Sequence, residues 1–220
     1  MTAPLDMTLD ELRAALADAL PAHAVFEGWS DAALSGAAAE LGVPADRAAL
    51  CFPGGAVDMI DTWFASIDAR MAAALDERGV RAMKIRDRIR TAVITRLDDA
   101  ASHPDALRRA LAILARPDHV ALAARLGWRA ADAMWRACGD VSVDFAWYSK
   151  RATLAAVYAA TMLAWMDDES EGFSDTRAFL DRRIDDVMKV ETLKARLRPS
   201  PDRMFSPARF LGRLRYGPAR

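Results

Sequence analysis

The residues best suited to a functional site are suited to binding rather than to catalysis. Residues 144–151 read DFAWYSKR and place aromatic rings directly beside charges of both signs. Large aromatic side chains with a polar tip are what a ligand cavity or a partner surface needs. The alternative is that the rings are ordinary core and the charges a solvated helix end, and composition alone favours this alternative.

Catalytic groups do not gather in the sequence. His23, His103 and His119 lie in unrelated segments, and the chain contains no HExxH, ExxH or GxSxG motif. Adjacent acids such as Asp167 and Asp168 point about 100° apart on a helix, which is typical of solvated charges. Nucleophilic, metal and redox catalysis need side chains in recognisable sets. We therefore expect no catalytic residues, no metal and no cofactor, although a general base on a lone aspartate stays open.

A buried helix is predicted directly after the aromatic residues. Residues 152–166 carry no charge, and their large side chains are Leu154, Val157, Tyr158, Met162, Leu163 and Trp165. A helix that is apolar around its whole circumference is buried in a core or in a membrane. This run is shorter than the ~20 residues that cross a bilayer. We predict a core helix from Ala152 to Met166.

Capping and breaking residues predict an all-α chain. Thr8 and Glu11 form a capping box for the first helix, which Pro21 is expected to break. Ser30 and Ser174 are predicted helix caps. In chain order the predicted helices are 9–20, 31–41, 44–52, a long one that ends near residue 78, 82–98, 104–116, 119–138, 152–166 and 174–197. On helix 82–98 we expect the arginines Arg86, Arg88, Arg90 and Arg96 to form a solvated face, and the alternative is contact with lipid phosphates.

Several stretches resemble a known family. They are DAMWRACGD, VDFAWYSKRATLAAVYAATMLAWMDD and FSDTRAFLDRRIDDVM, with FEGWSDAAL and FPGGAVDMID upstream. From about Phe26 to Met188 the chain resembles the coenzyme Q biosynthesis protein nine family. Its members are TetR-like helical proteins that bind isoprenoid lipids and assist the hydroxylation steps of ubiquinone synthesis. The resemblance implies a TetR-like bundle that forms a homodimer through helices 152–166 and 174–197.

The segment 37–55 resembles a TetR-type helix-turn-helix that has degenerated. Gly42 and Val43 stand in matching places, but Ala49 and Gly55 replace the usual aromatic and lysine. DNA affinity depends largely on Lys and Arg, and this module has only Arg47 among many carboxylates. We expect no nucleic-acid partner. The predicted domains are 1–78 (degenerate helix-turn-helix and connecting helix), 79–198 (ligand-binding and dimerisation bundle) and 199–220 (basic amphipathic tail).

The charge distribution is strongly polarised. The 220 residues carry a formal net charge of -1, with 53% hydrophobic and 28% charged residues, as in an ordinary soluble globule. Residues 1–70 contain eleven acidic residues against three basic ones, and residues 189–220 contain nine basic against two acidic. This polarity suggests an anionic partner or a membrane at the basic end.

The sequence also gives an expectation for the compartment. Cys51 and Cys138 form no CxxC pair, which favours reduced thiols. The first residues resemble neither a secretory signal nor a transit peptide. We expect the bacterial cytoplasm, peripheral to the inner membrane, or the matrix side of the mitochondrial inner membrane if the source is eukaryotic.

The tail predicts a short interfacial helix. Ser206 and Pro207 form a good cap and first position for a helix that ends at Tyr216. The expected membrane-binding residues are Arg209, Phe210, Leu211, Arg213, Leu214 and Arg215. Arginines beside one apolar face can reach anionic headgroups. The alternatives are a disordered basic tail and a helix docked on the protein itself.

The resemblance and the residue pattern together give a functional hypothesis. The expected wall of the lipid pocket is Met134, Trp135, Leu154, Val157, Tyr158, Met162 and Trp165. The expected partner-binding residues are Asp144, Trp147 and Tyr148, which match the DxxWY stretch of the family. The predicted role is a lipid-binding accessory protein that presents a ubiquinone precursor to a hydroxylase. The alternatives are a ligand-responsive TetR-type transcription regulator and a scaffold with an empty cavity.

Overall fold

The computed structural model describes residues 6–197 and divides the chain into two compact units, Met1–Asp181 and Arg182–Arg220. Within the described residues every regular element is helical, as predicted. The helices are α1 (Leu9–Glu27), α2 (Asp31–Glu40), α3 (Ala45–Cys51), α4 (Ala56–Glu77), α5 (Ile85–Ala100), α6 (Pro104–Leu114), α7 (Val120–Ala137), α8 (Phe145–Met166) and α9 (Ser174–Leu197). Short 3-10 turns occupy Val80–Ala82, Pro117–His119 and Glu171–Phe173.

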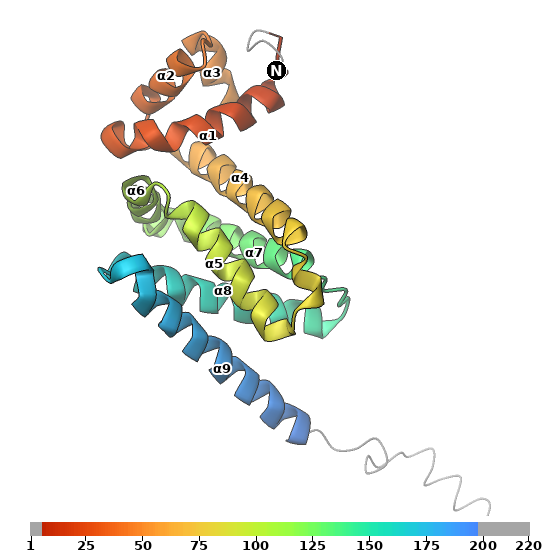
Figure 1. The fold of residues 1–220 in the computed structure, drawn as a ribbon. Coiled ribbons are helices and arrows are strands. Elements are labelled where there is room, and N and C mark those ends of the chain that lie inside the picture. The colour runs from red at the N-terminus through yellow and green to blue at the C-terminus, as the bar shows by residue number, and fades with distance from the viewer. Residues whose placement is uncertain (1–5, 198–220) are drawn as a thin grey trace, which may run out of the picture. The chain divides into compact units, whose positions relative to one another are not determined.

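In the first unit, α1, α2 and α3 gather at one end, and α4 leads from them toward α5, α7 and α8 (Figure 1). Two indole rings help to hold this end in place. Trp29 stacks on Trp63 of α4 with ring centroids 5.1 Å apart, and its Nε1 donates to the carbonyl of Ala106 at 3.0 Å. Because this hydrogen bond reaches α6, it fixes the predicted helix-turn-helix to the rest of the bundle.

The predicted helix caps are confirmed at the N-terminal end and wrong at α9. The capping box of Thr8 and Glu11 is present, and Ser30 Oγ accepts from the backbone of α2. At α9, Ser174 already has helical backbone angles. The free amides of that helix instead donate to Ser170 Oγ and to the Asp168 carboxylate. A cap depends on the path of the preceding chain, and here a 3-10 turn brings two earlier side chains to the helix end.

The prediction that Pro21 breaks the first helix is wrong, because α1 continues through it to Glu27. A proline in a helix interior costs about 3 kcal/mol. Pro21 lies on the buried face of α1 with Leu12, Leu16, Leu20 and Ala24. The burial of this face offsets the lost hydrogen bond, so tertiary packing overrides the local preference.

Two predictions for the central helix also need correction. It begins at Phe145 rather than Ala152, because the Asp144 carboxylate accepts from the amide of Ala146 at 2.9 Å and so caps it. It is not buried on all sides either, since Leu163 is 65% exposed. The seven residues before Ala152 include charges, and the sequence leaves open whether they precede the helix or form its solvated end. They form its first two turns.

Candidate functional site

Three aromatic rings cluster between α7 and α8. Trp147 and Tyr148 meet edge to face with ring centroids 4.8 Å apart. Trp128 of α7 lies 5.6 Å from Trp147 and 6.3 Å from Tyr148. Tyr148 is 59% exposed, while the two indoles are half-buried. The cluster is large, amphipathic and partly open to solvent, which is typical of a protein-binding surface.

Trp128 was not identified from the sequence. It stands twenty residues before Tyr148 and shares no motif with it. A possible signal was its helical spacing to Trp135 on the same predicted helix, but nothing local indicated which face of α7 meets α8. The predicted partner-binding residues therefore include two of the three rings, and Asp144 acts as the cap of the helix that carries them.

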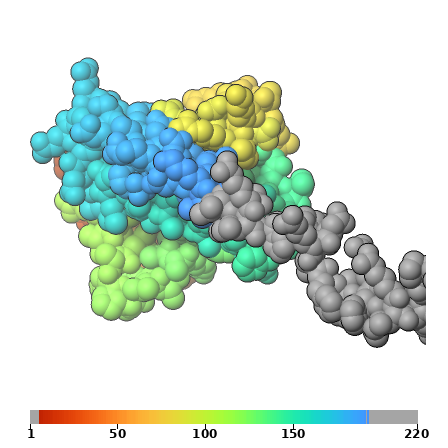
Figure 2. Space-filling model, turned by 90° about the horizontal axis from the view of Figure 1, so that it is seen from below, coloured from red at the N-terminus to blue at the C-terminus, as the bar shows by residue number. Residues whose placement is uncertain are grey.

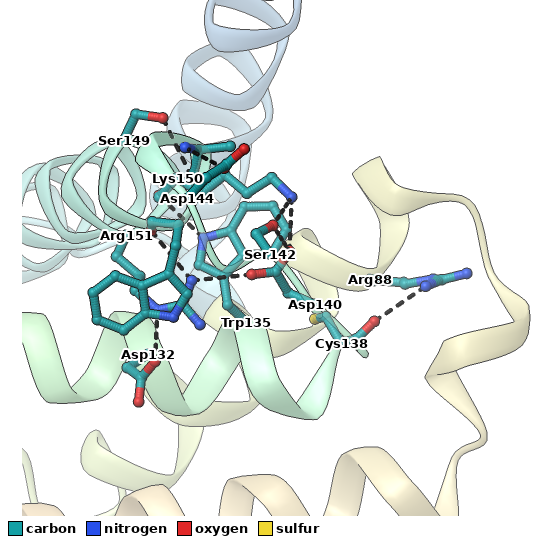
Figure 3. A network of polar contacts seen from close by, with 12 residues as sticks. Arg88, Asp132, Trp135, Cys138, Asp140, Ser142, Asp144, Ser149, Lys150 and Arg151 are labelled. Atoms are coloured by element: carbon teal, nitrogen blue, oxygen red, sulfur yellow. Dashed lines mark hydrogen bonds and ion pairs between the residues drawn. The ribbon is translucent and has the colours of Figure 1, made fainter.

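A buried arginine, Arg151, lies beside the cluster and contacts Asp132 and Asp140 (Figure 3). Arg151 is 1% exposed, and its guanidinium lies 4.2 Å from the ring centroid of Trp147. It donates to Asp132 of α7 at 2.6 Å, to Asp140 at 3.0 Å and to the carbonyl of Trp147 at 3.2 Å. A planar guanidinium presents its donors in a fixed fork while its face packs on a ring, and this geometry distinguishes it from an ammonium. Arg151 thus locks α7, α8 and the loop between them.

Asp140 is the second centre of this network (Figure 3). Burial raises the pKa of its carboxyl, but hydrogen bonds from Lys150, Ser142 and Arg151 lower it further, to about 2. Lys150 donates to Asp140 at 2.7 Å and lies 5.2 Å from the ring centroid of Trp135. The carboxylate is therefore ionised at neutral pH and fixes the loop that leads into α8.

The predicted pocket wall lies mostly in the core. Met134 and Trp165 are 0% exposed, and Leu154, Val157, Tyr158 and Met162 are also buried. Trp135 differs, because it is half-buried and its Nε1 donates to the carbonyl of Lys150 at 3.0 Å. The structure therefore places six of the seven residues on or beside the buried face of α8, and places the seventh in the polar network.

Tyr158 belongs to a buried charged group that the sequence did not indicate. Arg96 donates to its hydroxyl and, at 2.7 Å, to the carboxylate of Asp68. Arg96 is 2% exposed, so the prediction that it lies on a solvated face is wrong. Burial raises the pKa of the Tyr158 hydroxyl, and the Arg96 charge counteracts that shift. The three side chains tie α4, α5 and α8 together across the core.

A small cavity lies close to the end of α8. It measures about 10 Å³ and is lined by Ile94, Leu97, Asp98, Thr161, Phe173, Thr176, Arg177 and Leu180. Phe173 also packs on Trp165, with ring centroids 5.6 Å apart. The indole Nε1 of Trp165 is buried and is the one such side-chain atom, within residues 6–197, that has no hydrogen-bond partner. A buried donor without an acceptor costs free energy and calls for an explanation.

The remaining predictions concern the tail, the cysteines, metal binding and the membrane. The tail residues 209–215 lie outside the described residues. Cys51 and Cys138 are free and buried, and burial raises the pKa of Cys138 to about 11. In the described part of the chain, no group of three or more His, Cys, Asp or Glu side chains is placed to hold a metal ion. Among the same residues, no helix has the length and hydropathy needed to span a bilayer.

Comparison with known proteins gives consistent results. The family model described as COQ9 matches residues 120–191. The rat "Ubiquinone biosynthesis protein COQ9, mitochondrial" is 35% identical over 170 residues, which are 74% of this chain and 54% of that protein. The human protein of the same name is 34% identical over 178 residues, with coverages of 78% and 54%. The chain thus spans about half the length of these curated relatives.

A solved structure confirms the predicted fold. The chain superimposes with a TM-score of 0.65 on the TetR transcriptional regulator from Nitrosomonas europaea ATCC 19718. The two are 26% identical, and the match covers 82% of this chain and 99% of that one. The all-α bundle with an N-terminal helix-turn-helix is therefore TetR-like.

Proposed function

We propose that this chain, which is similar to the COQ9 proteins, acts in ubiquinone biosynthesis as a lipid-binding accessory protein without a catalytic role. It would bind an isoprenoid quinone precursor beside α8 and present it to a pathway hydroxylase. We place it at the surface of the inner membrane, in the bacterial cytoplasm or the mitochondrial matrix. The names of its relatives support the pathway, and the geometry around α8 supports the two proposed binding surfaces.

The observation that carries the lipid proposal is the unpaired Nε1 of Trp165. Phe173 packs on the Trp165 ring, and the guanidinium of Arg108 on α6 lies 5.3 Å from the centroid of the same ring. An oxygen of a quinone or phenol head group would accept the missing hydrogen bond, while the isoprenoid chain would follow apolar side chains. Ligand pockets typically measure about 300–1,000 Å³, so binding requires the nearby cavity to widen.

A crossed pair of tryptophan variants tests this proposal. Trp165→Phe and Trp29→Phe lose the same side-chain volume from buried sites, which lowers the melting temperature of both. Trp29→Phe also removes a donor that has a partner, so it should cost about 1 kcal/mol more than Trp165→Phe. In Trp165→Phe the stabilisation by added ubiquinone should fall, whereas in Trp29→Phe it should stay unchanged. Equal ubiquinone stabilisation in both variants would contradict the role of Trp165.

Lipid extraction and native mass spectrometry of the protein from its own cells give an independent test. A quinone or isoprenoid precursor at near-stoichiometric level supports the lipid-presenting role. A ligand-free protein, together with no stabilisation by ubiquinone, would instead support a scaffold.

The hydroxylase is proposed to dock on the cluster of Trp128, Trp147 and Tyr148. Aromatic residues of this kind contribute most to binding when they lie in the middle of an interface. Trp128→Ala, Trp147→Ala and Tyr148→Ala should each weaken hydroxylase binding by at least about tenfold, or 1.4 kcal/mol. Phe26→Ala is the matched control, because Phe26 is 80% exposed and lies on α1. If all three variants bind the hydroxylase with full affinity, the hydroxylase does not dock on this cluster.

The likeness to a solved TetR regulator favours one alternative, a ligand-responsive transcription regulator. Its recognition surface would be α3, where Ala49 and Leu50 are exposed and Arg47 is the single basic residue. Few phosphate contacts are available on such a helix. A gel shift against genomic fragments at low salt tests this, and a specific shift would favour the regulator.

Dimer formation remains part of the proposal. The exposed face of α8 carries Ala152, Ala156, Ala159 and Leu163 and no charge. Small and apolar residues at this spacing allow close contact with a second helix. Leu163→Glu should shift the protein from dimer to monomer in analytical ultracentrifugation, and a variant that stays dimeric would exclude this face.

A further inference from the structure

The loop between α7 and α8 has an inverted pattern of burial. Its residues alternate between polar and apolar from Asp140 to Phe145. In a half-buried extended segment the apolar side chains normally face inward. Here Val141, Val143 and Phe145 are 88%, 93% and 83% exposed, while the side chain of Asp140 is 4% exposed. The apolar side chains therefore point into solvent as a group.

Polar contacts hold the loop in this orientation. Asp140 accepts from Lys150, Arg151 and Ser142, and its amide donates to the carbonyl of Trp135 at 2.9 Å. Asp144 is engaged at the cap of α8. Because Asp140 and Ser142 are tied to each other and to Lys150, Val141 between them cannot turn inward without breaking a buried ion pair, which costs several kcal/mol. Val143 and Phe145 flank Asp144, which is itself exposed and fixes the start of α8. The exposure of the three apolar side chains is thus built into the loop.

A second exposed apolar segment lies beside this loop. Arg88 of α5 donates to the carbonyl of Cys138 at 3.1 Å, and Arg81 donates to the carbonyl of Ala137 at 3.4 Å. These bonds bring the start of α5 to the end of α7, as Figure 1 also shows. At the start of α5, Met83 and Ile85 are 37% and 42% exposed. Figure 2 shows both segments at the surface, residues near 80 in yellow and residues near 140 in green.

The charge around the second segment is positive. Residues 78–88 contain five basic residues and one acidic residue, and Asp76 and Glu77 precede them at the end of α4. In the loop, the carboxylate of Asp140 is offset by two cations, and the exposed carboxylate of Asp144 accepts from the amide of Ala146 at the start of α8. Exposed apolar side chains framed by arginine and lysine match the chemistry of an anionic lipid surface, with a hydrocarbon layer below charged headgroups.

We propose that this end of the bundle, the anchor loop 139–145 with residues 81–86, inserts into the interface of an anionic bilayer. A protruding side chain needs no matching pocket in lipid, whereas a protein partner would have to supply one for each of three residues. This contact is separate from the C-terminal tail and does not depend on the lipid-presenting role.

An environment-sensitive fluorophore on Val143→Cys reports insertion directly. The two native cysteines are buried, so the new thiol is the reactive one. With vesicles of phosphatidylglycerol and phosphatidylcholine, the emission should shift to the blue and increase, and pure phosphatidylcholine should give a weaker response. The same label on Phe26→Cys, an exposed position on α1, is the matched control and should not respond.

Vesicle sedimentation of the full chain measures the strength of the contact. The triple variant Val141→Ser, Val143→Ser, Phe145→Ser should partition at least about tenfold more weakly. Lys84→Ala should weaken partitioning about fivefold at low salt, and less at high salt. The control Phe26→Ser, Leu50→Ser removes similar exposed apolar surface from α1 and α3 and should leave partitioning unchanged.

Several results would overturn the proposal. One is an unchanged emission of the fluorophore at residue 143 while the protein sediments with vesicles, because the tail alone would then account for binding. Others are a protein that does not bind anionic vesicles at all, and a label that responds to the hydroxylase but not to lipid. In a chain that lacks residues 204–220, the label at 143 should still respond, at a higher vesicle concentration.

Discussion

Replacing Arg151 by methionine should destabilise the protein strongly, because this arginine is at the centre of the polar network between α7 and α8. The change keeps much of the apolar volume and removes the charge. It leaves Asp140 and Asp132 without one partner each, and it removes the contact with the ring of Trp147. The side chain is 2% exposed, so water cannot replace the lost bonds.

The expected loss of unfolding free energy follows from these contacts. Removal of one member of a buried ion pair costs about 3–5 kcal/mol. The cost here should lie near the lower limit, because Asp140 keeps Lys150 and Ser142, and Asp132 keeps Arg136. We expect about 3 kcal/mol, which lowers the melting temperature by about 6–12 °C for a chain of this size.

Arg136→Met is the matched control. Arg136 pairs with the same Asp132 at 2.7 Å, but its side chain is 71% exposed. An exposed pair of this kind contributes about 0–1 kcal/mol. Thermal and urea unfolding followed by circular dichroism at 222 nm compare the two variants. If Arg151→Met melts within about 1 °C of the parent, or if both variants lose equal stability, the burial argument is refuted.

Three further predictions concern the carboxylate, the core and the tail. The pKa of Asp140 is lowered to about 2. The ionised carboxylate therefore stabilises the folded protein by about 2 kcal/mol above pH 4, and this stabilisation is lost as the pH falls toward 2. Asp140→Asn should flatten the acid-unfolding curve between these pH values, and an unchanged curve would contradict the assignment. Tyr158→Phe takes an acceptor from the buried Arg96 and should cost about 1–3 kcal/mol in urea unfolding, whereas Tyr148→Phe at an exposed position should cost less than about 0.5 kcal/mol. Deletion of residues 204–220 should reduce binding to anionic vesicles in sedimentation, and unchanged binding would exclude the tail as a membrane contact.

The features that the sequence predicted correctly depend on neighbours along the chain. The capping box of Thr8 and Glu11 could be predicted because both partners lie within one helical turn. The all-α class followed from helical spacing and helix caps, and the TetR-like bundle followed from a resemblance over long ordered segments. Trp147 and Tyr148 are adjacent and belong to one motif, and their role in partner binding stays a prediction.

The features that only the tertiary structure decided depend on residues far apart in the chain. The sequence predicts that Arg96 is solvated, but in the structure α4 and α8 place Asp68 and Tyr158 beside it. Trp128 joined the aromatic cluster only because α7 packs on α8. The anchor loop has the alternation of an ordinary extended segment, and the sequence does not reveal which half of that alternation faces inward. Buried partners decide this, because a paired carboxylate inside the protein outweighs the tendency of valine to leave water.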